Sequence, residues 1–179
     1  MAILLAGIVL RVAWVGRPLD HRIRAPWRQA DYTQIARNFA REDPDLLHPR
    51  IDWRRDGQGL VEMEFPLVPW TAGMLDRLFG YREQYLRLLS CLLEVGGLLL
   101  FAGLARRLLP GAGALAAVAF YAVNPLLVYL STVMQPEPMM LFLSLLAMVL
   151  LERYARLVIR VGINRREMAI ETVRSSLAR

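Results

Sequence analysis

The stretch YLRLLSCLLEVGGLLLFAGL, residues 85–104, decides the fold class of this chain. Leu, Val, Gly and Ala dominate it, and Arg87 and Glu94 are its only charged residues. A helix that spans a membrane needs about 20 predominantly apolar residues. The stretch therefore predicts a transmembrane helix, and the apolar stretches 112–130 and 139–154 predict two more.

Residues 1–15 form a shorter apolar stretch, which Arg11 interrupts. Either the Arg11 side chain reaches the membrane interface, or the natural chain begins upstream of Met1. A cleaved signal peptide is a further interpretation, but no positively charged segment precedes Ala2. The sequence thus predicts an all-α membrane protein with about four transmembrane helices, one at 1–15 and three at 85–154.

Charge predicts the orientation of these spans. Apolar residues make up 56% of the chain and charged residues 21%, and all 22 basic residues are arginine. Because cytoplasmic loops are rich in basic residues, Arg106, Arg107 and the basic tail 155–179 are expected in the cytoplasm. The loop 16–84, with 11 basic and 11 acidic residues, is then extracytoplasmic. The net charge of +6 reflects this topology and contact with membrane lipids, and predicts no nucleic-acid partner.

The extracytoplasmic loop is expected to contain two amphipathic juxtamembrane helices. In 31–41, Tyr32, Ile35 and Phe39 recur at helical spacing, and 65–79 forms an apolar segment too short to span a membrane. Asp31 opens the first of these helices. Its carboxylate is interpreted either as a cap for free backbone N–H groups or as a catalytic group.

Glu137 lies between two prolines at the outer mouth of the last span. An ionisable group near hydrocarbon costs roughly 2.5 to 3.5 kcal/mol, so both Asp31 and Glu137 are candidates for a functional site. The alternative for Glu137 is an ordinary polar turn. Glu94 lies within a span, where it must find a partner or bind a proton, and an interhelical hydrogen bond beside Gly96 and Gly97 is the favoured interpretation.

Other kinds of site find no support. Cys91 is the single cysteine, so the chain has no disulfide framework and no cysteine-based metal site. His21 and His48 lie far apart in the sequence without further ligands at helical spacing, so no zinc site is expected.

The order of these features resembles the N-terminal part of GT-C fold glycosyltransferases. The features are a short first span, an acidic residue entering an amphipathic helix, a second interfacial helix near EFPLVPW at 64–70, and PEP at 136–138 on the same outer face. The resemblance covers roughly residues 5–152. It is greatest to bacterial members related to protein O-mannosyltransferases and to the lipid A aminoarabinose transferase.

The resemblance implies a glycosyltransferase that moves a sugar from a polyprenyl-phosphate donor to an extracytoplasmic lipid, glycan or protein acceptor. It also implies a multi-pass protein of the bacterial cytoplasmic membrane. Asp31 matches the family's catalytic acidic position, where it serves as the base, and Glu137 matches a second one that positions the acceptor or a divalent metal ion. Arginine is well suited to a phosphate, so Arg50, Arg54 and Arg55 are candidates for the donor phosphate.

Two departures from the family pattern stand out. Asp31 is followed by Tyr32, where protein O-mannosyltransferases carry an Asp-Glu pair, so the acceptor chemistry does not transfer. Family members also have many more spans, so we interpret the chain as an N-terminal fragment that is inactive alone. The alternative function is a non-catalytic polytopic protein, either a transporter fragment or an assembly subunit. The carboxylates at one surface and the lack of a repeat favour the transferase.

Overall fold

The computed structural model describes residues 1–13, 15, 26–54, 56–82 and 84–177, with the side chains of Pro26 and of 165–177 excepted. The described part of the chain contains seven helices. The only pairing of extended backbone within it is one bridge between Arg50 and Leu60. The predicted all-α class is therefore confirmed for the described residues.

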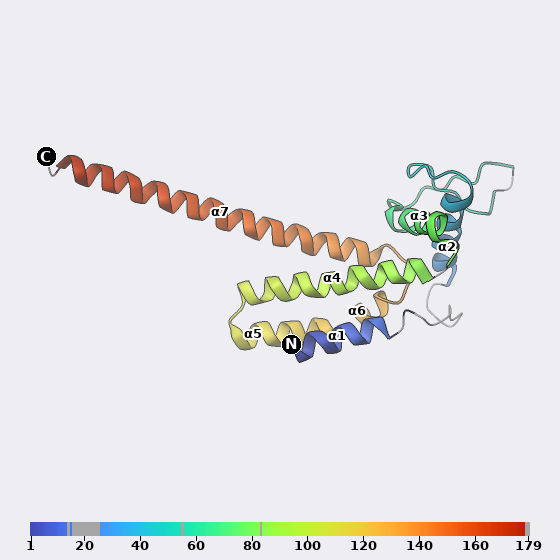
Figure 1. Ribbon diagram of the computed structural model, residues 1–179, viewed down its shortest axis with the longest axis horizontal. Helices are drawn as coiled ribbons and strands as arrows, with labels where there is room; N and C mark the ends of the chain where they lie inside the picture. Colours follow the sequence, from blue (N-terminus) through green and yellow to red (C-terminus); the bar gives the residue numbers. More distant parts are fainter. Residues whose placement is uncertain (14, 16–25, 55, 83, 178–179) are drawn as a thin grey trace.

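Helix α4, Gln84–Leu108, is the centre of a bundle with α1 and α7 (Figure 1). It contains the stretch predicted as a span, and within the described residues it is the one helix long and apolar enough to cross a membrane. Helices α1, Ala2–Val12, and α5, Gly111–Val123, are apolar but shorter. The structure thus confirms one candidate span, and the predicted number of about four is not established.

The stretch predicted as a single span at 112–130 is broken. Helix α5 ends at Val123, and the short helix α6, Pro125–Leu130, follows it directly. Pro125 has no N–H to donate within a helix. The Asn124 side chain caps α6 instead, because its Oδ1 accepts from the N–H of Leu126 at 2.9 Å. This break turns the chain towards the segment 131–136, which leads into α7.

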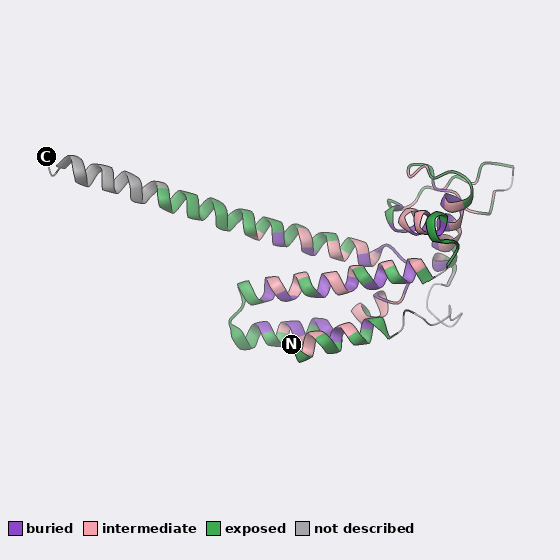
Figure 2. Cartoon of the chain, in the orientation of Figure 1, coloured by how far each residue is buried: buried purple, intermediate pink, exposed green. Residues whose placement is uncertain are grey.

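Helix α7, Glu137–Leu177, continues well past the predicted end of the last span at residue 154. At about 1.5 Å per residue its 41 residues extend roughly 60 Å. Its first half packs on α4, whereas the later described side chains are mostly exposed (Figure 2). The boundary predicted between a span and a basic tail therefore coincides with no break in the helix. The side chains of Arg165, Arg166 and Arg174 lie outside the described residues.

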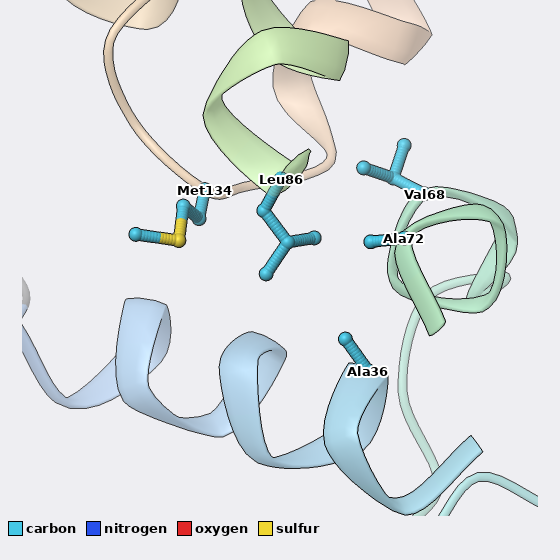
Figure 3. Close-up of a cluster of buried hydrophobic side chains, with 5 residues drawn as sticks. All are labelled: Ala36, Val68, Ala72, Leu86 and Met134. Atoms are coloured by element: carbon cyan, nitrogen blue, oxygen red, sulfur yellow. The ribbon is translucent and has the colours of Figure 1, made fainter. Parts of the chain in front are cut away.

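Helices α2, Pro26–Arg41, and α3, Leu67–Phe79, are the two predicted amphipathic helices, and they pack against each other. The apolar face expected for α2 is buried, with Tyr32, Ile35 and Phe39 each 1% exposed. A cluster of buried side chains joins these helices to α4 and to the 131–136 segment (Figure 3); its members are Ala36, Val68, Ala72, Leu86 and Met134.

The two ends of the bundle differ in their residues. Helices α2 and α3 lie beside the N-terminal end of α4 and the start of α7, whereas the C-terminal end of α4 lies at the far end of the bundle (Figure 1). At that far end Arg107 pairs with Glu152 at 3.0 Å, and Arg156 contacts the same carboxylate. Asp31 of α2 and Glu137 of α7 thus lie at one end of the bundle, and the paired Arg107 and Arg156 lie at the other. The predicted topology requires this separation.

Candidate functional site

Helix α2 determines how Asp31 is presented. The helix begins at Pro26, a residue type favoured in the first turn because its fixed φ suits a helix and its missing N–H is not needed there. The prediction that the helix begins at Asp31 is therefore wrong. Asp31 lies in the second turn, so its carboxylate is not an N-terminal cap, and its catalytic role stays a prediction.

Arg28, one turn before Asp31, joins three segments that are far apart in the sequence. Its guanidinium lies 3.1 Å from Oε1 of Glu137, the first residue of α7. It also contacts Oε1 of Glu64, which precedes α3. Arg28, Glu64 and Glu137 are each about one-third to one-half exposed, so these pairs contribute little stability by themselves. Their effect is geometric: they bring the carboxylate of α7 to the start of α2.

A pocket of about 430 Å³ lies beside this ion-paired group, and Arg28, Asp31, Tyr32 and Glu64 all contribute to its wall. Of the pocket carboxylates, Glu64 is held by Arg28. Among the described residues, the Asp31 carboxylate has neither an ion pair nor a hydrogen bond, and its side chain is partly exposed. Glu62 on the same wall is likewise unpaired among the described residues but is exposed, so Asp31 is the more enclosed of the two pocket carboxylates that are available to accept a hydrogen bond from a bound hydroxyl group.

Tyr32 adds a hydroxyl group to the same wall. Its ring is buried, and its hydroxyl donates to Oε2 of Glu64 at 3.3 Å. Burial and the neighbouring Glu64 carboxylate raise the pKa of the Tyr32 phenol above its ordinary value. The Tyr32 hydroxyl therefore stays protonated at neutral pH and acts as a hydrogen-bond donor.

An apolar groove of about 350 Å³ lies between α3, α4 and α7. Its wall begins close to the ion-paired group, because Leu67 follows Glu64 by three residues and Met139 follows Glu137 by two residues. The other residues that line it are Val68, Thr71, Leu89, Leu92, Leu93, Phe142 and Leu143. The pocket beside Asp31 and the apolar groove are thus linked through one set of ion-paired residues, which line the pocket or closely precede residues of the groove in sequence.

The arginines predicted to hold a phosphate lie elsewhere. Arg54 contacts Glu42, and Arg50 lies 3.9 Å from both Glu42 and Asp43, just after α2. Asp31 is ten residues before the end of α2, a separation of roughly 15 Å at the usual helical rise. The structure therefore does not bring Arg50 and Arg54 to Asp31, and Arg55 lies outside the described residues.

Inside the bundle, two interpretations of charged residues are wrong. Arg11 does not reach an interface, because it is fully buried, with its Nε 3.9 Å from Oε2 of Glu94. The Glu94 oxygens have no hydrogen-bond partner among the described residues, so the expected interhelical hydrogen bond is replaced by this ion pair. Gly96 and Gly97 do allow close helix contact: a Cβ would lie 2.8 Å from Phe142 and 3.1 Å from the Tyr121 hydroxyl, respectively.

Arg28, Glu64 and Tyr32 are the site residues that the sequence analysis missed. Arg28 and Glu64 flank the predicted helices, and this position was the signal in the sequence that could have identified them as site residues. Their pairing across 36 residues could not be read from spacing. No group of three or more His, Cys, Asp or Glu side chains in the described part of the chain is arranged to hold a metal ion.

Comparison with known proteins finds a matching family. Residues 64–157 match the family model of the dolichyl-phosphate-mannose-protein mannosyltransferases. The match begins at Glu64 and includes Glu137, whereas Arg28 and Asp31 precede it. No curated protein and no solved structure matches the chain.

The fold and the family match define the class of protein as a membrane glycosyltransferase of the GT-C type. The chain belongs to the dolichyl-phosphate-mannose-protein mannosyltransferase family.

Proposed function

We propose that this protein transfers a sugar from a polyprenyl-phosphate donor to a hydroxyl group of an extracytoplasmic acceptor. The observation that carries the proposal is that Arg28, on the wall of the pocket beside Asp31, pairs with Glu64 and Glu137, which closely precede the α3 and α7 residues of the apolar groove. A lipid-linked sugar phosphate has a polar head and a long apolar chain. Its sugar fits the pocket beside Asp31, and its lipid chain fits the groove between α3, α4 and α7.

Asp31 is the general base of this reaction. The acceptor oxygen forms a bond to the anomeric carbon of the sugar, and the bond from that carbon to the phosphate oxygen breaks. The lipid phosphate leaves with the electron pair, and the acceptor proton passes to the Asp31 carboxylate. The absence of a protein partner for Asp31 among the described residues supports this role, because a base must be free to accept the proton.

Arg28 is the first candidate to bind the leaving phosphate. A guanidinium can bind two oxygens of a phosphate at once, and Arg28 reaches both the pocket and the start of α7. Binding would exchange at least one of its carboxylate partners for the phosphate. Arg50, Arg54 and Arg55 are second candidates to bind the phosphate. Arg50 and Arg54 rank below Arg28 because the acidic residues that pair with them lie beyond the end of α2. Glu137 then positions the acceptor.

The test is the substitution Asp31→Asn, which keeps the shape of the side chain and removes the base. Membranes that contain the chain, alone and within a longer homologous protein, are assayed for transfer of a labelled sugar from a panel of polyprenyl-phosphate sugars. Transfer should fall by roughly 10² to 10⁴ for Asp31→Asn. Asp56→Asn is the matched control, since Asp56 is an exposed carboxylate outside the pocket wall, and it should leave the rate unchanged.

Two results would contradict the proposal. If Asp31→Asn retains transfer within a few-fold of the wild type, Asp31 is not the base. If neither the chain nor the longer protein transfers a sugar from any donor of the panel, the proposed reaction itself is wrong.

A further inference from the structure

The break between α5 and α6 deprives two backbone carbonyls of their usual helical partners. In a continuous helix the Tyr121 carbonyl would accept from the N–H of residue 125, but Pro125 has none. The Ala122 carbonyl would accept from the N–H of Leu126, which donates to the Asn124 side chain instead, at 2.9 Å. Within an apolar bundle such carbonyls need another donor, because water is not there to supply one.

Arg11 of α1 supplies these donors. Its Nη1 donates to the Ala122 carbonyl at 2.9 Å, and its Nη2 donates to the Tyr121 carbonyl at 3.3 Å. Nη1 also donates to the Gly7 carbonyl within α1 at 3.0 Å. Arg11 is fully buried, and Glu94 balances its charge from 3.9 Å away.

Close contact between α1 and α5 makes this arrangement possible. A Cβ at Gly7 would lie 2.9 Å from the Ala122 Cβ and 3.0 Å from Leu98, so a larger residue would push the two helices apart. The guanidinium also lies 5.8 Å from the centre of the Tyr121 ring, within the range of a cation–π contact. The Arg11 side chain is thus held from α1, α4 and α5 at once.

The break matters for the site because α6 leads into the 131–136 segment and then to Glu137. Met134 of that segment packs in the cluster shared by α2, α3 and α4, and it lies 3.5 Å from the Thr33 hydroxyl (Figure 3). A continuous α5–α6 helix would carry this segment in another direction. Glu137 would then be moved away from Arg28.

We propose that Arg11 is a positioning residue that replaces the N–H donors missing at the α5–α6 break, and so holds the segment that carries Glu137 against α2. The inference about the break is independent of any sugar transfer. Only the importance of the position of Glu137 rests on the proposed function.

The experiment separates carbonyl binding from charge pairing by three sets of substitutions. Arg11→Met with Glu94→Gln removes the donors without leaving an unpaired charge, and the wild type is its reference for stability, because Glu94→Gln alone leaves the buried Arg11 charge without its partner. Adding Pro125→Ala to the double variant returns an N–H to position 125. Leu98→Ala, with and without Pro125→Ala, is the matched control, because Leu98 is a fully buried packing residue of α4.

Melting temperature in detergent is the first measurement. The double variant should melt at least about 5 °C below the wild type, because two buried carbonyls lose their donors. Pro125→Ala should recover at least half of that loss in the double variant and none of the loss caused by Leu98→Ala. Should the double variant fail to accumulate, the triple variant is expected to accumulate.

Cross-linking is the second measurement and reports the position of the 131–136 segment. Thr33→Cys and Met134→Cys are introduced with Cys91→Ala and joined by a short thiol-specific cross-linker. The yield should fall several-fold when Arg11→Met and Glu94→Gln are added, and stay at the wild-type level with Glu94→Gln alone.

Three outcomes would overturn the inference. The double variant could melt within about 1 °C of the wild type, a difference too small for two lost donors. Pro125→Ala could fail to rescue the double variant, or could rescue Leu98→Ala equally well. An unchanged cross-linking yield would show that Arg11 does not position the segment before Glu137. None of these results depends on a sugar donor, so failure here is distinct from failure of the proposed function.

Discussion

Substitution of Gly73 by Ala should loosen α3 from α2 and thereby disturb the candidate site. A Cβ at position 73 would lie 2.6 Å from the Ala36 carbonyl, 2.8 Å from the Phe39 Cβ and 3.3 Å from the Ala40 nitrogen. These atoms belong to the backbone of α2 or are fixed directly to it. No side-chain rotation relieves the contact, so the two helices must separate by several tenths of an ångström.

The cost follows from this geometry. Overpacking of a well-packed core typically costs about 1–3 kcal/mol, and alanine in place of glycine within a helix returns roughly 0.5–1 kcal/mol. The difference between these ranges is about 0–2.5 kcal/mol. The contacts below 3.0 Å with atoms fixed to the α2 backbone favour its upper part, a net loss of unfolding free energy of about 1–2 kcal/mol for Gly73→Ala. For a chain of this size that loss lowers the melting temperature by about 2–8 °C.

Gly103→Ala is the matched control for this prediction. Gly103 also lies in a helix, α4, and a Cβ there meets nothing within 4 Å. The control should therefore raise the melting temperature by about 1–4 °C, because only the helical gain applies. Both variants are measured in the same detergent by a thermal unfolding assay. If Gly73→Ala melts at or above the wild type, the close packing of α2 on α3 is not as the structure has it.

Three further predictions concern the site and its orientation. Arg28→Gln should raise the KM for the lipid-linked donor at least about 10-fold, because a charge-assisted hydrogen bond to the phosphate is lost. Steady-state kinetics at varied donor concentration measures this KM. The pKa of Tyr32 is raised in the folded protein, so the neutral phenol favours the fold. The free energy of unfolding, measured by chemical unfolding, should therefore fall as pH rises above 10. It should fall less steeply in Tyr32→Phe. Single cysteines at Thr132 and Arg106, in a Cys91→Ala background, should react with an impermeant thiol reagent from opposite sides of the membrane.

Each of these has a clear contrary outcome. A KM unchanged in Arg28→Gln would remove Arg28 from the donor site. Identical alkaline unfolding of the wild type and Tyr32→Phe would show that the phenol is not buried against Glu64. Labelling of positions 132 and 106 from the same side would refute the topology that places Glu137 outside.

Local patterns predicted the helices well, since hydrophobic spacing is a property of neighbouring residues. Tyr32, Ile35 and Phe39 are all buried on one face of α2, as their spacing indicates. The pattern failed at boundaries, where apolar spacing gives no stop signal. Pro125 divides one predicted span into α5 and α6, and α2 begins five residues before Asp31.

Only part of the candidate site was predictable. The sequence singled out Asp31 and Glu137 because a carboxylate near a membrane is costly, and the family match includes Glu137. Arg50 and Arg54 were chosen for their charge alone, and charge does not show which carboxylate a side chain meets. In the structure both are paired with residues at the far end of α2.

The sequence by itself determined the helical class, the family and the segregation of charge, because each is encoded in composition or local spacing. Tertiary structure alone decided which charged groups meet. Arg28 joins Glu64 and Glu137 from distant segments, and Arg11 crosses from α1 to the carbonyls freed by Pro125. Such pairings depend on how the helices cross and where one of them breaks. The spacing of residues along one chain does not contain that information.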